Sequence, residues 1–391
     1  MDLIPYGRQA IDEDDISAVL DVLKSDFLTG GPVLEKFEEE FAHTVGAKYA
    51  ISVCNGTAAL HLAMLACRIG TGDRVLTSPN TFLASANSVI YAGGTPDFVD
   101  IDPLTYNLDI ESLKKSWSDD VKAVIPVAYA GQAPDMASIY KFAKENSAYV
   151  IEDVCHGTGG AIEENGEIYK LGGHSFADLS VFSLHPVKTI TSGEGGMLTT
   201  NNLELAEKAR LLRNHGMVRQ PEKFNGCLPD YGPWTYEMQE LGLNYRLTEM
   251  QAALGLSQLK KLEGFVKRRR EIVETYNSAF QALQWLQTPS LRNPLEQGHI
   301  SWHLYSPSWD FQKLGRSRSE VMAFLRDQGI LTQVLYIPVY LQPYYQENYG
   351  YRLGKCANAE YVYERALSLP LFPSMNEVDV QHVIKSVYQL M

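Results

Sequence analysis

Lys188 is the residue whose surroundings most suggest chemistry, because it is the only lysine in the stretch FSLHPVKTITSGEGGML, residues 182–198. An apolar, strand-like run precedes it, and Gly193, Gly195 and Gly196 follow it. Loss of water or a nearby cation lowers the pKa of a lysine amine, which can then form a Schiff base with a carbonyl. The glycines let the backbone turn tightly past a bound ring. A surface lysine before a glycine turn is the competing explanation.

A carboxylate stands at a comparable place earlier in the chain. Asp153 ends the apolar run YVIED (149–153), and ligands of open α/β sheets bind outside such strand ends. A carboxylate there can pair with a cationic ring nitrogen. Taken alone, Asp153 is equally well explained as a turn or capping residue, and His156, three residues on, as a packed histidine.

Two polar turns lead into helical patterns. In NGTAALHLA (55–63), Gly56 allows close backbone approach, and the Thr57 hydroxyl can cap the helix or donate to a phosphate at its N-terminus. In GLNYRLTEMQAA (242–253), Asn244 enters a long helix, for which simple capping is the competing explanation. In the stretch around Lys188, Ser183 is a further hydroxyl that can donate to a phosphate.

Strands and helices must position these residues, and their alternation predicts an α/β fold with a mainly parallel, seven-stranded sheet. The strand candidates are apolar on both faces, as expected for a sheet covered by helices on both sides. They are YAISVC (49–54), DRVLTSP (73–79), TPDFVDI (95–101), KAVIPVAY (122–129), YVIED (149–153), LSVFSLH (179–185) and GMLTTN (196–201).

The pattern changes after residue 245, which predicts two domains. Residues 1–248 form a large domain, and residues 249–391 form a long connecting helix, broken near Gly264, and a small α+β domain with short strands such as ILTQVLYI (330–337). Within that helix, KRRR (267–270) is interpreted as a solvated face rather than an anion site.

Composition excludes several classes of protein. A net charge of −13 provides no broad basic face for nucleic acid. No apolar run approaches the roughly 20 residues of a membrane helix, and the N-terminus does not resemble a signal peptide. Five scattered cysteines without a C-x-x-C pair predict neither disulfides nor zinc, and they favour a reducing cytoplasmic location.

Competing catalytic motifs are absent from the sequence. It has no G-x-x-x-x-G-K-[ST], no G-x-G-x-x-G after a strand, no H-E-x-x-H and no G-x-S-x-G. A dinucleotide-dependent dehydrogenase would fit the α/β pattern but lacks its glycine fingerprint. HISWH (299–303) spaces two histidines for a metal but has no nearby carboxylate, so we expect no metal site.

The order of these features resembles a pyridoxal-phosphate site, and the whole chain resembles the DegT/DnrJ/EryC1/StrS sugar aminotransferases of fold type I. The resemblance covers essentially the full length. It is carried by PYGRQAIDEDDI, SDFLTGGP, NGTAALHLA, NTFLASANSV, IEDVCHGTGG, FSLHPVKTITSGEGGM, RNHGM and LNYRLTEMQAALGLSQL.

The resemblance implies a role for each matching residue. Lys188 would hold the cofactor and shuttle the substrate proton, and Asp153 would pair with the pyridine nitrogen. His156 would contact the phenolic oxygen of the cofactor. The remaining cofactor contacts would come from Gly56, Thr57, Phe82, Ser183 and, from the partner subunit of a homodimer, the residue at the position of Asn244. Substrate contacts would come from Tyr6, Phe27, Leu28, Thr29, His185, Leu335 and Tyr336.

Within the family, VKTITSGEGG and GILTQVLYIPVYLQPYY are most similar to the branch that makes pseudaminic acid precursors. That branch implies transfer of the amine of L-glutamate to the 4-position of UDP-4-keto-6-deoxy-N-acetyl-β-L-altrosamine. Leu335 and Tyr340 replace two histidines of the family pattern, which puts hydrogen bonds from those positions in doubt. Asn55 replaces the usual serine, which we expect to be tolerated.

Three alternatives remain beside this hypothesis. The first is amination of a different nucleotide-linked keto sugar, or of another carbon. The second is a sugar dehydratase of the same family, although dehydratases carry histidine where Lys188 stands. The third is a non-catalytic regulator or sugar-binding module, which the complete set of cofactor residues argues against.

Overall fold

The computed structural model describes residues 3–226 and 232–391. Seven strands form one sheet in the order β1-β9-β8-β5-β4-β2-β3, and only β9 runs antiparallel to its neighbours. All seven predicted strands are present, and the mainly parallel sheet is confirmed. They are β1 (Tyr49–Val53), β2 (Arg74–Thr77), β3 (Thr95–Phe98), β4 (Val121–Ile125), β5 (Tyr149–Asp153), β8 (Leu179–Ser183) and β9 (Gly196–Thr200).

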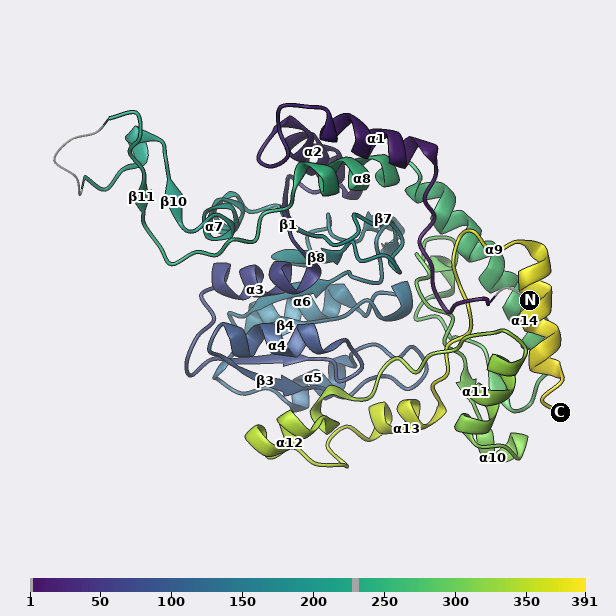
Figure 1. The fold of residues 1–391 in the computed structure, drawn as a ribbon. Helices are drawn as coiled ribbons and strands as arrows, with labels where there is room; N and C mark the ends of the chain where they lie inside the picture. Colours follow the sequence, from purple (N-terminus) through teal and green to yellow (C-terminus); the bar gives the residue numbers. More distant parts are fainter. Residues whose placement is uncertain (1–2, 227–231) are drawn as a thin grey trace.

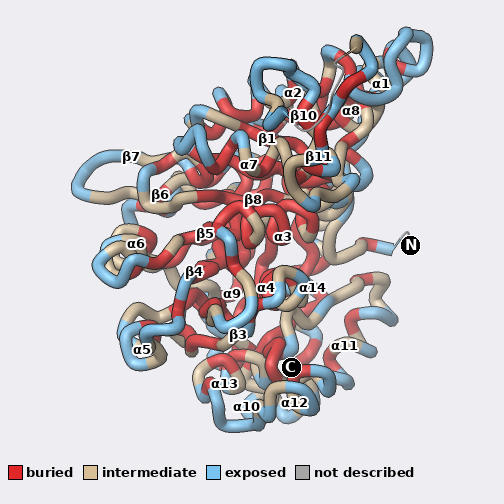
Figure 2. The backbone as a smooth tube through the Cα atoms, turned by 90° about the vertical axis from the view of Figure 1, so that its left-hand side faces the viewer, coloured by how far each residue is buried: buried red, intermediate tan, exposed pale blue. Residues whose placement is uncertain are grey.

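Helices cover both faces of the sheet, which explains its strands of continuous apolar residues (Figure 1). One face is covered by α3, α4 and α7 through a buried cluster, and the other by α2, α6 and α8 through a second cluster. Figure 2 shows the sheet strands buried and the outer helix surfaces exposed. The helices of this part are α1 (Glu13–Leu23), α2 (Pro32–Val45), α3 (Gly56–Ala66), α4 (Leu83–Tyr91), α5 (Ile110–Lys115), α6 (Met136–Glu145), α7 (Leu203–Arg213) and α8 (Glu249–Leu259).

Two hairpins stand outside the main sheet. The strands β6 (Ala161–Glu164) and β7 (Glu167–Lys170) pair with each other, and β10 (Met217–Val218) pairs with β11 (Glu237–Met238). The second hairpin projects away from the body of the molecule (Figure 1). Its side chains Trp234 and Met238 are 72% and 64% exposed.

The long connecting helix is two helices, α8 and α9 (Leu262–Phe280). The break is at Lys261, not near Gly264, so the predicted position was wrong. Gly264 lies inside α9 with open space around it, and nothing in the packing bends the chain there. The turn at Lys261 is instead held by Asp15 of α1, whose carboxylate lies 2.9 Å from the lysine amine.

The KRRR segment is not a solvated face. Of its residues only Lys267 is exposed, and Arg269 is completely buried. The Arg269 guanidinium donates to the carbonyl oxygens of Leu371 at 2.8 Å and His303 at 3.3 Å. Burial lowers the pKa of Arg269 to about 10.

The C-terminal part has its own hydrophobic core, which α9, α11 and α14 form together with Ile4 of the N-terminal arm. Because α8 and the start of α9 pack on the core of the sheet, the division at residue 248 stays a proposal. The elements are α10 (Phe311–Leu314), α11 (Arg318–Asp327), α12 (Pro343–Tyr349), α13 (Ala357–Arg365), α14 (Glu377–Tyr388), β12 (Leu286–Gln287) and β13 (Ser308–Trp309).

The strand expected at residues 330–337 does not form. Only isolated bridges at Ile330 and Gln333 occur there. Side chains take over backbone hydrogen bonds that a neighbouring strand would otherwise make: the Tyr129 hydroxyl donates to the Leu335 carbonyl at 2.5 Å, and the Asn80 side chain accepts from the Tyr336 N–H at 3.4 Å.

No helix in the two described ranges is long and apolar enough to cross a membrane. Within the same residues, no cluster of histidine, cysteine and acidic side chains could hold a metal ion. Cys54, Cys67, Cys155 and Cys356 are free thiols, and Cys227 lies outside the described residues.

Candidate active site

Lys188 lies in the loop that follows β8, at the edge of the sheet where the parallel strands end. The loop is closed by backbone hydrogen bonds, among them Leu184 N–H to Gly195 at 2.8 Å and Lys188 N–H to His185 at 2.9 Å. Burial lowers the pKa of the Lys188 amine, while the nearby acidic groups of Cys155 and Asp153 oppose that shift. A lysine with a lowered pKa has more neutral, nucleophilic amine at neutral pH than a surface lysine.

Asp153 is the last residue of β5 and is 4% exposed. One carboxylate oxygen accepts the Cys155 N–H at 3.1 Å, and the other accepts the Ser85 hydroxyl at 2.8 Å. A carboxylate offers about four lone-pair positions, so Asp153 can still accept from a cationic ring nitrogen. This is the position at which the sequence predicts such a partner.

His156 is held as a neutral imidazole with a defined tautomer. Burial, and then the charge of Lys188, keep the pKa of His156 well below its usual range. The Ala130 N–H donates to Nδ1 at 3.3 Å, so the proton is on Nε2, which lies 3.0 Å from the Tyr336 hydroxyl. His156 therefore donates to Tyr336, whose own hydroxyl hydrogen is left for another acceptor.

The turn between β1 and α3 presents backbone N–H groups at a helix N-terminus. The side chain of Asn55 caps α3 by accepting the Ala58 N–H at 2.8 Å, so the serine replacement noted in the sequence keeps a capping group. The N–H groups of Gly56 and Thr57 precede the first helical hydrogen bond and point out of the helix. A Cβ on Gly56 would lie 3.1 Å from that of Ser183, so these two residues are adjacent.

A group of aromatic side chains lies beside His156. The Tyr336 ring stacks on the His156 ring at 5.9 Å and lies 6.3 Å from Phe82, whose side chain is 59% exposed. Tyr6 and Leu335 pack against the same hydrophobic cluster as Tyr336. Burial raises the pKa of Tyr336 well above its usual range, so its phenol stays protonated.

Other predicted residues lie on the surface of the single chain. His185 and Asn244 are exposed, as are Phe27, Leu28 and Thr29. Thr29 pairs with Thr248, which anchors the segment Phe27–Thr29 to the start of α8. Asn244 pairs with Asn214 at the base of the projecting hairpin. Their predicted contacts with substrate and partner remain predictions.

Sequence reasoning missed three buried residues around this group. Ser85 and Thr81 connect to Asp153, and the His303 ring lies 4.5 Å from the His156 ring. The available signal was the pair of hydroxyls four residues apart at the start of α4, next to Phe82. His303 was considered only as half of a metal motif with His299, and it instead packs under His156.

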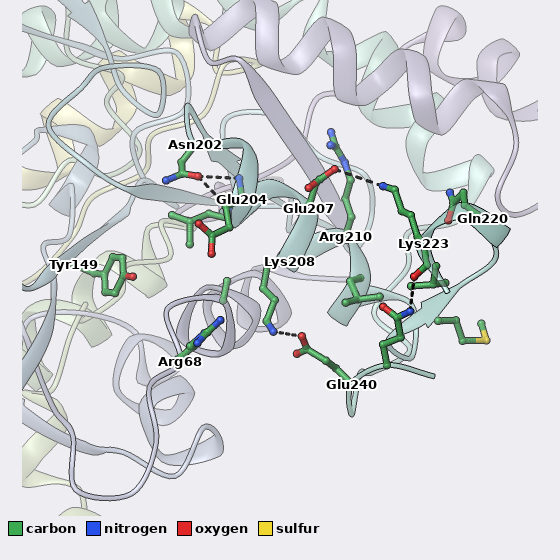
Figure 3. Close-up of a pocket in the computed structure, with 16 residues that line it drawn as sticks. Arg68, Tyr149, Asn202, Glu204, Glu207, Lys208, Arg210, Gln220, Lys223 and Glu240 are labelled. Atoms are coloured by element: carbon green, nitrogen blue, oxygen red, sulfur yellow. Dashed lines mark hydrogen bonds and ion pairs between the residues drawn. The ribbon is translucent and has the colours of Figure 1, made fainter. Parts of the chain in front are cut away.

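A cavity of about 790 Å³ lies elsewhere, between α7 and the projecting hairpin (Figure 3). Charged side chains of both signs line it, and several pair with one another, such as Lys223 with Glu207 at 3.7 Å. None of the predicted site residues lines this cavity. The chemistry is therefore assigned to the edge of the sheet and not to this cavity.

The set at the edge of the sheet fits one cofactor chemically. It combines a half-buried lysine whose amine has a lowered pKa, a buried carboxylate, a helix N-terminus with free N–H groups and an aromatic face. With this sheet order, these features define a pyridoxal-phosphate-dependent transferase of fold type I.

The chain belongs to the DegT/DnrJ/EryC1/StrS aminotransferase family, whose sequence model matches residues 9–388. Spore coat polysaccharide biosynthesis protein SpsC of Bacillus subtilis is 42% identical over 385 residues, which cover 98% of this chain and 96% of SpsC. The structure of Helicobacter pylori PseC, an aminotransferase involved in the biosynthesis of pseudaminic acid, superposes with a TM-score of 0.88 at 32% identity and covers 99% of both chains.

A third match bears on the cofactor. The structure of a putative sugar aminotransferase, Spr1654 from Streptococcus pneumoniae, in its PLP form superposes with a TM-score of 0.87 at 25% identity over the whole of both chains. The protein is thus a sugar aminotransferase, and its cofactor is pyridoxal 5′-phosphate.

Proposed function

We propose that this protein transfers the amine of L-glutamate to the 4-position of a UDP-4-keto-6-deoxy-N-acetylhexosamine of β-L-altro configuration, in pseudaminic acid biosynthesis. The observation that carries the sugar assignment is the full-length likeness to PseC, with 99% of both chains covered. The lowered pKa of the Lys188 amine, at the edge of the sheet, supports the chemistry.

Lys188 is the residue to which the cofactor is attached and the base that moves the substrate proton. When bound, pyridoxal phosphate supplies an electron sink for the carbanion formed at the substrate carbon. Asp153 holds the ring nitrogen in its protonated form. Because burial lowers the pKa of Lys188, more of its amine is neutral than in a surface lysine, so it would take the proton from the substrate α-carbon and pass it to the cofactor.

The remaining residues bind and orient. Gly56, Thr57 and Ser183 receive the cofactor phosphate at the start of α3, where N–H groups and the helix dipole favour an anion. Phe82 offers an exposed aromatic face for the ring. His156 fixes Tyr336 so that the phenol points its hydrogen away from the imidazole and toward an acceptor in the site.

Substrate binding involves the segments that close around this site. We assign the nucleotide sugar to Tyr6, Phe27–Thr29, His185, Leu335 and Tyr336. Tyr340, by contrast, is completely buried, and its hydroxyl binds Glu360. Tyr340 therefore stabilises the C-terminal part. We assign no hydrogen bond from this position to the substrate.

The primary experiment compares the wild type with Lys188→Ala and with Lys122→Ala, an exposed lysine on β4 used as the matched control. We expect a visible absorption band of bound cofactor in the wild type and the control only. Glutamate should bleach the band, and the β-L-altro keto sugar should restore it. A band that persists in Lys188→Ala contradicts the role of that amine, and restoration only by another keto sugar contradicts the substrate.

A homodimer is part of the same proposal, with Asn244 reaching the cofactor phosphate of the partner. Support comes from the projecting hairpin, whose residues Trp234, Tyr236 and Met238 are at least half exposed in the single chain. Mixing inactive Lys188→Ala with inactive Asn244→Ala tests this directly. A residue acting across the interface leaves one intact site in each mixed dimer, so activity returns. If mixing restores nothing, Asn244 acts within its own chain.

A different nucleotide-linked keto sugar is the second candidate, and one observation favours it. The identity with SpsC, 42%, is higher than that with PseC, 32%. The replacement at Leu335 also changes a polar position next to Tyr336. Comparing kcat/KM for UDP- and dTDP-linked 4-keto and 3-keto sugars decides between the candidates, because the true substrate should exceed the others by orders of magnitude.

A further inference from the structure

Two hydroxyl groups at the start of α4 form a buried chain that ends on Asp153. Thr81 and Ser85 are 3% and 1% exposed, and their oxygens lie 2.7 Å apart. The Ser85 oxygen is 2.8 Å from Oδ2 of Asp153. The second carboxylate oxygen is held by the Cys155 N–H at 3.1 Å.

The direction of these hydrogen bonds follows from counting hydrogens. An ionised carboxylate only accepts, so the single hydroxyl hydrogen of Ser85 points to Asp153. Ser85 must then accept at its other contact, and Thr81 must donate. Hydrogen bonds arranged head to tail polarise one another, and a charged acceptor strengthens them further.

The two hydroxyls are not needed to begin the helix, where serine and threonine usually act as caps. The capping position of α4 is Phe82, and no side chain caps its N–H groups. The next hydroxyl along the helix, Ser88, donates to the Ser85 carbonyl at 3.0 Å and does not face Asp153. The start of α4 therefore directs Ser85 to the carboxylate and Thr81 to Ser85.

We propose that Thr81 and Ser85 are positioning residues that set the orientation and charge of Asp153 toward the ring nitrogen of the cofactor. This inference rests on the proposed role of Asp153. Donation by Ser85 stabilises the ionised carboxylate and fixes its plane, which leaves the remaining lone pairs of Asp153 for the protonated nitrogen. Phe82, between the two hydroxyls in sequence, places the same helix start against the face of the ring.

The test measures cofactor binding to apoprotein, with pyridoxal phosphate and with its 1-deaza analogue, in which a ring C–H replaces the nitrogen. Both are titrated into wild type, Ser85→Ala, Thr81→Val and Ser88→Ala, and binding is read by fluorescence. Ser88→Ala is the matched control, since it removes an equally buried serine hydroxyl from the same helix. Thermal unfolding of each apoprotein reports whether the fold is kept.

We expect Ser85→Ala to weaken binding of pyridoxal phosphate about tenfold, the effect of losing one hydrogen bond to a charged group. The deaza analogue should bind wild type and Ser85→Ala equally, because it presents no nitrogen to Asp153. Thr81→Val should shift binding in the same direction by a smaller factor, and Thr81→Ser should restore it. Ser88→Ala should bind both compounds like the wild type.

Three outcomes overturn the inference. Equal weakening of both compounds by Ser85→Ala indicates a general packing role, and no weakening of either indicates no role. If the wild type binds both compounds equally, Asp153 does not contact the ring nitrogen, and the inference is wrong. Failure of the proposed function gives a different result, because the wild type would then not attach the cofactor through Lys188.

Discussion

Glu249 offers the sharpest test of how the fold holds the segment expected to bind the sugar. Its carboxylate is 1% exposed and accepts the N–H groups of Gly31 at 2.9 Å, Val33 at 2.9 Å and Leu34 at 3.2 Å. These are the free N–H groups at the start of α2, where a negative charge is stabilising. The Glu249 N–H in turn donates to the Leu28 carbonyl at 3.0 Å.

The substitution Glu249→Gln removes the charge and replaces one acceptor oxygen by an NH₂ group. The remaining oxygen can keep the bonds to Gly31 and Leu34, but the NH₂ then faces the Val33 N–H. An unsatisfied buried donor costs about 1–3 kcal/mol. Loss of the charge at a helix N-terminus adds about 1 kcal/mol. We therefore expect the free energy of unfolding to fall by about 3 kcal/mol.

Urea unfolding measures the global effect, and hydrogen exchange of residues 24–34 measures the local one. Exchange there should accelerate more than in the sheet, and KM for the sugar should rise more than the dissociation constant of the cofactor. Glu39→Gln, an exposed residue in the middle of α2, is the control and should change stability by less than about 0.5 kcal/mol. A loss below about 1 kcal/mol with unchanged exchange would refute the reasoning.

Three further predictions concern the groups around Lys188. Tyr336→Phe leaves the His156 Nε2–H without its acceptor and should lower kcat/KM for the sugar about tenfold, with a smaller effect on the reaction with glutamate; equal losses for both substrates would contradict the assigned role. Attachment of cofactor to apoprotein should accelerate with pH through a midpoint below 10.5, because burial lowers the pKa of Lys188; stopped-flow absorbance between pH 6 and 11 measures it, and a midpoint at 10.5 or above contradicts it. Burial also holds the pKa values of His156 and His303 well below 6.5. Below pH 6.5 the unfolded chain therefore binds more protons than the folded chain. The free energy of unfolding should fall as the pH drops, by about 1.4 kcal/mol per pH unit for each histidine. Urea unfolding at pH 5.5 and 7.5 checks this, and equal stabilities would show that neither histidine is kept neutral by the fold.

The sheet could be predicted from sequence because a strand buried on both faces leaves a continuous apolar run. The ends of those runs also located Asp153, Gly56 and Ser183. Residues at strand ends and helix starts are fixed relative to one short element, so a local pattern indicates where they lie, whereas the roles predicted for them come from the family resemblance. The structure brings these three residues to the same edge of the sheet.

Properties that depend on distant parts of the chain were not predictable in this way. Arg269 has the sequence context of a solvated charge, yet its guanidinium is buried because the carbonyl oxygens of His303 and Leu371 receive it. Residues 330–337 have the composition of a strand, but side chains of the sheet domain occupy the backbone groups of Leu335 and Tyr336. The sequence around Arg269 does not indicate its carbonyl partners, and the sequence around Leu335 and Tyr336 does not indicate theirs.

The chain of hydroxyls on Asp153 shows where the limit of local reasoning lies. Ser85 follows β2, whereas Asp153 ends β5, and β4 lies between these strands in the sheet. Hydrophobic periodicity gives the existence of each strand but not their order, so no pattern indicates that the start of α4 reaches across the end of β4. Once the order β5-β4-β2 is known, the helix after β2 must begin at the same edge as Asp153, because all three strands are parallel. A hydroxyl in the first turn of that helix can then reach a buried carboxylate. The strand order therefore explains why Ser85 contacts Asp153.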